Sequence, residues 1–328
     1  MPAEFTSSDA DSPRNRPPRL VRGMVLVAAT MTLAGVVARG ALVTGAAAPG
    51  PLDAGRWRSH ANGDRVAQVL VDGEDIWVAS LGGGVLRWST ATRDYRQFLA
   101  PQDGLPSNQV NALLRDLDGT VWAATERGLA WLPAGQDRWR ALTPHQAPAM
   151  PSENVTALVA DGQEAIWVGF SQAWDPQRPN PRTGEPGAFS LGGLARFQIE
   201  TQTWSDVTHV TKDGGPAREG FTTLPSENVT ALSTSTDGSL WVGTRPYHVW
   251  QDRDCGGEIC PGDQGSWIET GGGLAARKGA EWTVWASSED SAACFPAHVT
   301  GLAADGAGRM WVATIGHGAL VMRHGLQI

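Results

Sequence analysis

Apolar and polar positions recur along this chain in a pattern that repeats five times. Each repeat contains an aliphatic run, a polar turn with Asp or Gly, an apolar residue and then a tryptophan. From the first Val of the run to the tryptophan there are 11 residues in the first repeat and 12 in the other four. This spacing indicates two strands joined by one tight turn. The marker tryptophans are Trp77, Trp122, Trp167, Trp241 and Trp311.

Two further strands are expected after each of the first four marker tryptophans, and one after the fifth. The first two strands of each repeat are apolar at nearly every position, which is typical of a sheet covered on both faces. A Gly followed by an aliphatic or small residue begins each third strand, at Gly84, Gly128, Gly193, Gly273 and Gly318. An aromatic residue marks each fourth strand, at Tyr95, Trp139, Trp204 and Trp282.

Four short strands per repeat, covered on both faces, predict an all-β fold, namely a β-propeller with four-stranded blades. The fifth repeat has only three such strands, whereas residues 56–60, ahead of the first repeat, read as a fourth strand around Trp57. Joining the two ends completes a fifth blade and removes exposed sheet edges. The sequence therefore predicts five four-stranded blades closed by the N-terminal strand. A ring of six or seven blades with undetected repeats is the alternative.

The first 48 residues differ in composition from the rest. Four arginines between positions 14 and 22 precede an apolar run at 24–38, and small residues follow up to Ala48. This order is typical of an export signal, but Arg39 and Pro49 also fit a segment, 24–48, that stays in the membrane as a single anchor. We expect residues 1–48 to be an export signal or membrane anchor. Residues 49–328 are then a single propeller domain outside the cytoplasm, secreted or anchored by residues 24–48.

Charge and cysteine content limit the partners and the redox setting. The net charge of −8 and the lack of a basic cluster argue against a nucleic-acid partner. Contact with a membrane is expected only through the N-terminal segment. In an exported chain, three cysteines are expected to form one disulfide and leave one thiol over. Cys255 and Cys260 are the disulfide candidate, and Cys294 is the rival partner.

Loop lengths single out the third and fourth repeats. From the marker tryptophan to the aliphatic residue of the third strand there are 7 residues in the second repeat, 27 in the third and 33 in the fourth. In an up-and-down blade all of these loops leave the same face of the propeller. Long loops on a rigid scaffold are common places for binding sites. The alternative is that both loops are surface insertions.

The two long loops combine aromatic side chains with carboxylates and other polar groups. This combination suits sugars, because rings stack on C–H surfaces while polar groups bond hydroxyls. The alternative for the tryptophans is that they hold the loops together as small local cores. We expect the ligand to be a glycan, a peptide or an envelope protein. The candidate ligand-binding residues are Trp174, Asp175, Arg178, Tyr247, His248, Trp250, Asp252 and Trp267.

Catalytic chemistry has less support in the sequence. Asp252, Asp254 and Glu258 could supply a carboxylate pair for glycoside hydrolysis, and His248 beside Asp252 could serve a lyase or a metal. The histidines show no metal-ligand spacing, and no Gly-rich loop opens a helix for phosphate binding. The sequence therefore favours a binding protein without metal or cofactor. The alternatives are a propeller lyase or glycoside hydrolase with its site in an axial funnel, and a structural scaffold.

Three of the repeated segments resemble a known family. Residues 105–108 (Leu-Pro-Ser-Asn), 224–232 and 240–244 (Leu-Trp-Val-Gly-Thr) are similar to the two-component regulator propeller repeat, and the resemblance extends over residues 57–325. In that family the propellers are typically sensor modules outside the cytoplasm, ahead of a histidine kinase, and are often linked to polysaccharide sensing. No kinase or receiver follows the repeats here. The resemblance therefore implies a sensor-like ligand-binding or scaffolding relative.

Overall fold

The computed structural model describes residues 65–180, 183–210, 223–252, 265–286, 295–323 and 326–327. These residues belong to one compact unit, Arg58–Ile328. They form strands and turns, and no described helix is long and apolar enough to cross a membrane. The predicted export signal or anchor at 1–48 and the predicted closing strand at 56–60 lie outside the described residues.

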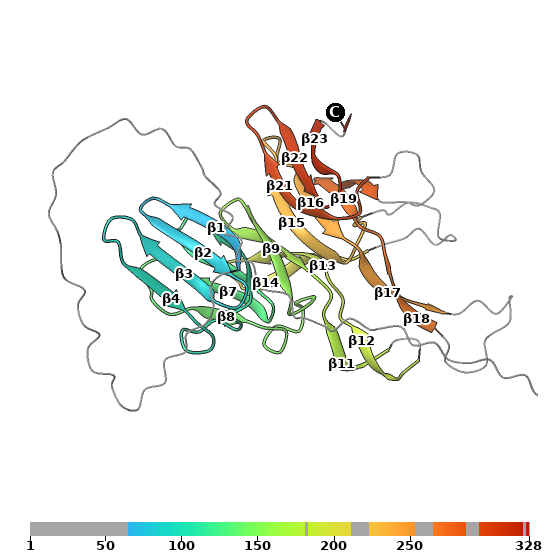
Figure 1. Cartoon of the computed structure of the whole chain (residues 1–328), viewed down its shortest axis with the longest axis horizontal. Helices are drawn as coiled ribbons and strands as arrows, with labels where there is room; N and C mark the ends of the chain where they lie inside the picture. Colours follow the sequence, from blue (N-terminus) through green and yellow to red (C-terminus); the bar gives the residue numbers. More distant parts are fainter. Residues whose placement is uncertain are drawn as a thin grey trace, which may run out of the picture. The chain divides into compact units, whose positions relative to one another are not determined.

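Five four-stranded antiparallel sheets follow one another along the chain, one for each repeat (Figure 1). The first blade has β1 (Val66–Asp72), β2 (Asp75–Ser80), β3 (Gly84–Ser89) and β4 (Tyr95–Phe98). The second has β5 (Val110–Arg115), β6 (Val121–Thr125), β7 (Gly128–Leu132) and β8 (Arg140–Leu142). The third has β9 (Val155–Asp161), β10 (Ala165–Phe170), β13 (Gly193–Gln198) and β14 (Thr203–Thr208).

The fourth blade has β15 (Asn228–Thr234), β16 (Leu240–Arg245), β19 (Gly273–Lys278) and β20 (Glu281–Ala286). The fifth has β21 (Val299–Ala304), β22 (Arg309–Thr314), β23 (Gly318–Arg323) and β24 (Leu326–Gln327). The five-bladed all-β propeller predicted from the sequence is confirmed.

The outer edge of the fifth blade differs from the sequence-based expectation. Its fourth position holds β24, whose two residues pair with Met322 and Arg323 of β23. The sequence analysis assigned this position to residues 56–60 instead. A strand of two residues is too short to show an apolar pattern, so it could not be predicted from the sequence.

All five third strands begin at the glycine predicted for them. Gly273 shows why glycine is needed there. Its φ is +139°, and a Cβ at this position would lie 2.2 Å from the carbonyl oxygen of Trp285 on the neighbouring strand. An L-residue with a side chain fits neither that backbone conformation nor that approach, so the repeat fixes glycine at the strand start.

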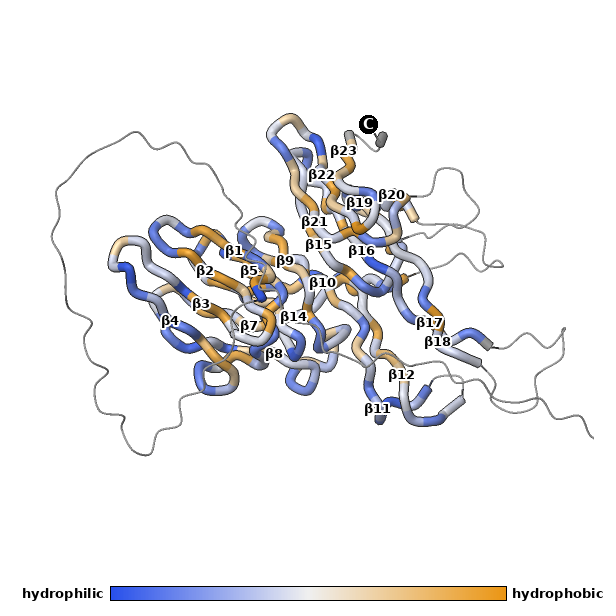
Figure 2. The backbone as a smooth tube through the Cα atoms, viewed as in Figure 1, coloured by the Kyte–Doolittle hydropathy of each residue, from blue (hydrophilic) through white to orange (hydrophobic). Residues whose placement is uncertain are grey.

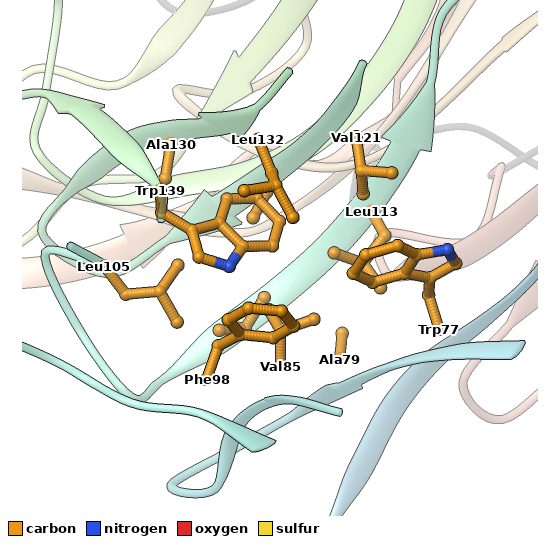
Figure 3. Packing of buried hydrophobic residues seen from close by; sticks show 12 residues of the cluster. Trp77, Ala79, Val85, Phe98, Leu105, Leu113, Val121, Ala130, Leu132 and Trp139 are labelled. Atoms are coloured by element: carbon orange, nitrogen blue, oxygen red, sulfur yellow. The ribbon is translucent and has the colours of Figure 1, made fainter. Parts of the chain in front are cut away.

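The marker tryptophans form the core between successive blades. Trp77 of the first blade is buried among Leu113, Leu132 and Trp139 of the second blade, and its ring meets that of Trp139 edge-on at 6.4 Å (Figure 3). The next three marker tryptophans lie in clusters that include residues of the following blade. In Figure 2 much of the strand length is apolar, while many turns are polar. Apolar burial between blades is the main source of stability in such an arrangement.

Each first strand has a β-bulge near its start, and in the second, third and fourth blades this bulge links the blade to the next one. The bulge residue has no partner in the ladder of its own blade, so its side chain is free to reach the next one. Asn111 Nδ2 donates to the carbonyl of Val155 at 2.7 Å. Thr156 and Thr230 make the same bond to Val229 and Val299, at 2.7 and 2.6 Å. These hydrogen bonds set the register between the second, third, fourth and fifth blades.

Candidate ligand-binding site

The long connections of the third and fourth blades are hairpins rather than irregular loops. Strands β11 (Trp174–Pro179) and β12 (Pro186–Phe189) form one hairpin, and β17 (Tyr247–Asp252) and β18 (Gly265–Thr270) form the other. Both hairpins are visible in Figure 1. The sequence analysis expected loops here, because prolines and glycines interrupt the alternation that marks a strand.

Asn228 connects the bases of the two hairpins. Its side-chain oxygen accepts a hydrogen bond from the backbone N–H of Gln172 at 2.8 Å, and its Nδ2 donates to the carbonyl of Pro246 at 2.6 Å. The side-chain amide of Gln172 then pairs with the backbone of His248. Its Nε2 donates to the His248 carbonyl at 3.0 Å, and its Oε1 accepts the His248 N–H at 2.7 Å. The two hairpins are thus fixed to each other at their bases.

Glu227, next to Asn228, is a buried carboxylate that holds the adjoining backbone. It accepts hydrogen bonds from the N–H of Gly192 at 3.1 Å and of Val210 at 2.9 Å, and His209 Nδ1 lies 3.3 Å from Oε2. A Cβ at Gly192 would lie 1.9 Å from the Glu227 carbonyl oxygen, so this approach requires glycine. Buried carboxylates persist where donors of this kind surround them.

The hydrogen bond that His209 donates to the Glu227 carboxylate raises the pKa of His209 above its usual value of 6.5, and partial burial opposes this shift. The pKa of Tyr247 is raised to about 12, because the phenol is buried and secondly because it lies near the Glu227 carboxylate. Tyr247 is therefore a neutral hydroxyl at any physiological pH.

Aromatic rings pack against one another between the hairpins. Phe189 stacks on the His248 ring at a centroid distance of 4.1 Å and meets Trp267 edge-on at 5.1 Å. Trp174 lies against Phe189 at 5.1 Å and against Trp267 at 6.3 Å, and Trp250 against Trp267 at 5.7 Å. The predicted alternative that these tryptophans form a local core therefore describes part of their role, because they do hold the two hairpins together.

A cavity of about 830 Å³ lies beside this aromatic cluster. Its polar lining includes Gln172, Arg178, Glu227 and His248, and aromatic side chains provide much of the remaining wall. Ligand pockets of this size, largely apolar with a few polar groups, are typical of small-molecule and cofactor sites. The full lining is Gln172, Arg178, Pro179, Phe189, Ser190, Leu191, Val210, Glu227, Tyr247, His248, Val249, Trp250 and Trp267.

The structure brings most of the predicted site residues together at this cavity. Five of the eight candidates line it: Arg178, Tyr247, His248, Trp250 and Trp267. Trp174 does not line the cavity, but it is in edge contact with Trp267 at 6.3 Å and is 51% exposed. Asp175 does not line the cavity. Its Oδ1 accepts a hydrogen bond from the N–H of Gln177 in the same hairpin at 2.8 Å.

Several predictions concern residues beyond the described part of the chain. The side chain of Asp252 is one of them, although its backbone lies in β17. The two other acidic candidates, Asp254 and Glu258, lie outside the described residues, as do Cys255, Cys260 and Cys294. The disulfide prediction therefore stays a prediction. Among the residues that the structure describes, no group of three or more His, Cys, Asp or Glu side chains is arranged to hold a metal ion.

The sequence analysis did not name Gln172, Phe189 or Glu227 as site residues. Glu227 lies in the repeated segment that precedes the first strand of a blade. The repeat itself accounts for the residues of this segment, so no sequence signal distinguished Glu227 as a site residue. Phe189 is a large apolar residue in a mostly polar connection, which was a detectable sign of packing. Gln172 contributes through its hydrogen bonds to backbone, a role that no residue pattern reveals.

Comparison with protein families locates a known repeat beside this cavity. Residues 223–245, which include β15, β16 and both Glu227 and Asn228, match the two component regulator propeller model. The chain carries a two component regulator propeller repeat. The resemblance predicted from the sequence is confirmed at this repeat. A comparison with curated protein sequences gives no significant match.

Two solved structures share the fold of this chain. Both are of the extracellular domain of BT4673 from B. thetaiotaomicron, described as a one component system in one case and as a hybrid two component system in the other. Each is 15% identical in sequence and matches 79% of this chain, with TM-scores of 0.51 and 0.52. The match spans only 27% of each of those chains. At this identity the likeness shows the propeller fold alone.

Proposed function

We propose that the protein is a sensor-like β-propeller outside the cytoplasm that binds a ligand in the cavity between the hairpin β11–β12 and the hairpin β17–β18. The observation that carries the proposal is the cavity itself, about 830 Å³ in volume and lined from both hairpins. The hydrogen bonds of Asn228 and Gln172 fix the two walls before any ligand arrives. A preformed site loses less entropy on binding, which favours affinity.

The lining indicates the kind of ligand. The Nε2 and Oε1 atoms of Gln172 both form hydrogen bonds with the His248 backbone. The Glu227 carboxylate accepts hydrogen bonds from two backbone N–H groups and pairs with His209. Aromatic and aliphatic residues therefore make up much of the wall, and Arg178 and His248 also line it. A ligand with a flat apolar face and a few polar groups fits this wall, such as the C–H face of a sugar or an aromatic side chain of a short peptide.

Localisation outside the cytoplasm is part of the same proposal. The basic and apolar N-terminal segment supports it, as does the similarity in fold to extracellular domains. We propose that residues 1–48 direct export or anchoring, and that residues 49–328 form the ligand-binding domain.

The test is a thermal-shift screen of the full chain with neutral oligosaccharides and short peptides, followed by calorimetric measurement of Kd for each hit. Replacing Trp267→Ala should weaken binding at least tenfold, because the indole contributes to the cavity wall. The matched control is Trp88→Ala, which removes an exposed indole from the first blade. An unchanged Kd in the Trp267→Ala protein would exclude this cavity as the site.

The same samples separate binding from catalysis. A lyase or hydrolase would convert the oligosaccharide hit, and product would appear by chromatography. A binding protein returns the hit unaltered at full occupancy. Product that disappears in the variant Glu227→Gln would favour the enzymatic alternative over the proposal.

A further inference from the structure

One residue position changes its environment abruptly between the blades. The first Val of the first strand is 0% exposed in four blades, at Val110, Val155, Val229 and Val299. In the first blade the equivalent residue, Val66, is 55% exposed. The four buried valines pack on the preceding blade, and no described blade precedes the first. Among the residues that the structure describes, Val66 is therefore one half of a junction whose other half is missing.

The rest of this surface behaves in the same way. By strand register, Val69, Trp88 and Tyr95 of the first blade correspond to Leu113, Leu132 and Trp139 of the second. The three second-blade residues are buried against the first blade, whereas their counterparts are exposed. We call this surface the first-blade face. It comprises Val66, Val69, Val71, Trp88 and Tyr95.

The fifth blade presents the opposite half of a junction. Its marker residue, Trp311, is 42% exposed, while the other four marker tryptophans are between 2% and 7% exposed. In β22 every second residue is exposed, and the buried ones, Met310 and Val312, pack toward the fourth blade. We call the exposed surface the fifth-blade face. It comprises Thr300, Ala303, Trp311, Ala313 and Ala319.

The interior junctions show how two such faces fit. A small residue two positions after the marker tryptophan receives the first Val of the next blade. At Gly169 an added Cβ would lie 2.5 Å from Val229 Cγ1, and at Gly243 it would lie 2.4 Å from Val299 Cγ1. Ala313 is the equivalent small residue of the fifth blade, and it is exposed.

The fifth blade also has the donor of this hydrogen bond across the junction, but not the acceptor. Thr156 and Thr230 each donate from the bulge position to the carbonyl of the next blade's first Val. Thr300 occupies the same bulge position in the fifth blade. It is exposed, and its hydroxyl has no hydrogen bond within the described part of the chain.

We propose that the fifth-blade face of one copy of this protein binds the first-blade face of a second copy. Val66 of the second copy would pack on Ala313 beside Trp311, and the Thr300 hydroxyl would donate to the Val66 carbonyl. The contact repeats the geometry of the interior junctions, which the structure shows between the second and third, third and fourth, and fourth and fifth blades. It is head-to-tail, because the two faces match each other and neither matches itself.

A second copy is the occupant that the exposures support. Both faces belong to the same compact unit, and both remain exposed within it. An apolar surface that includes two aromatic rings and three valines on one blade is costly to leave in water. The occupant must carry the complementary half of a blade junction, and another copy carries it.

The experiment is sedimentation velocity of the full chain over a concentration series. The wild-type protein should associate. Val66→Glu and Ala313→Arg should each weaken association at least tenfold, because each places a charge in an apolar junction. Both residues are exposed, so neither change disturbs the core of one chain. Leu117→Glu, at an exposed turn residue of the second blade, is the control and should associate like the wild type.

Mixing the two variants tests the head-to-tail geometry. The Val66→Glu chain keeps an intact fifth-blade face, and the Ala313→Arg chain keeps an intact first-blade face. An equimolar mixture should therefore form a one-to-one complex that neither variant forms alone. A mixture that stays monomeric would overturn the proposal. So would a monomeric wild-type chain whose melting temperature falls in both variants, because that result means closure within one chain.

Discussion

Strands β10 and β22 carry nearly the same residues in different surroundings. Residues 166–169 read Ile-Trp-Val-Gly, and residues 310–313 read Met-Trp-Val-Ala. Every residue of β10 is buried, whereas β22 alternates between buried and exposed residues. The third blade has a blade on each side, and the fifth has one described neighbour. The pattern of a repeat thus determines the strand, while the neighbouring blade determines how much that strand contributes to stability.

The largest expected effect compares the two marker tryptophans of these strands. Trp167→Ala should lower the free energy of unfolding by about 3–5 kcal/mol, because a buried ring is lost and a cavity remains. Trp311→Ala should cost only about 1 kcal/mol in the monomer, because Trp311 is already 42% exposed in the folded chain. Urea unfolding of both variants under monomeric conditions measures the difference. Equal losses would mean that Trp311 is covered in solution.

A second comparison concerns two asparagines that end the same repeated segment. Asn228→Ala removes two hydrogen bonds and leaves the Gln172 N–H and the Pro246 carbonyl without this partner. We expect a loss of about 2–3 kcal/mol. Asn108→Ala removes one bond, from the N–H of Ala100, and should cost about 1 kcal/mol.

Thermal unfolding with calorimetry ranks the two asparagine variants. Ligand binding should also weaken in Asn228→Ala, because the hairpins lose their common support, and should stay unchanged in Asn108→Ala. If the two variants lose the same stability and both keep full affinity, the hairpins do not depend on Asn228.

The smallest effect concerns His209, at the junction of the third and fourth blades. Its folded-state pKa is raised above 6.5 by the Glu227 hydrogen bond. The stabilisation is therefore complete below pH 6.5 and is lost as the pH rises through the folded-state pKa. About 0.5 kcal/mol is expected, since the ring is partly exposed. Urea unfolding across this range should show the decline in the wild type and not in His209→Gln; identical pH profiles would exclude the linkage.

The regular parts of the fold could be predicted because the same residue pattern occurs five times in the sequence. The glycines that begin the third strands were all predictable, since the close approach of the backbone requires them, and so was the first valine of each first strand, which is buried in four of the five blades. The strand β24 and the two hairpins occur outside the repeat. Their short or proline-interrupted sequences carry no periodic pattern, and their pairing depends on contacts with distant residues such as Asn228.

The residues of the candidate site also fall into those that could be predicted from the sequence and those that could not. The aromatic candidates Trp250 and Trp267 could be predicted, because large rings in a long polar loop require a partner or a ligand. The roles of Glu227 and Gln172 could not be predicted, because both residues bond to backbone N–H groups that are distant in sequence. Insertions into a repeat can therefore be located from the sequence. The hydrogen bonds and contacts between two insertions are seen only in the three-dimensional structure.

The second and fourth blades allow the most direct test of the ligand site. In both, a threonine at the end of the second strand donates to the glycine that begins the third: Thr125 to Gly128 at 2.8 Å, and Thr244 to Gly273 at 3.0 Å. Two residues, Glu126 and Arg127, join them in the second blade, and residues 245–272 do so in the fourth. Replacing 245–272 with Glu-Arg therefore gives the fourth blade the turn of the second.

The measurement is the Kd of this shortened chain for the oligosaccharide or peptide that binds the wild type, with circular dichroism as the check on folding. The proposal predicts a folded propeller with no detectable binding. A folded, shortened chain that binds with wild-type affinity would contradict it.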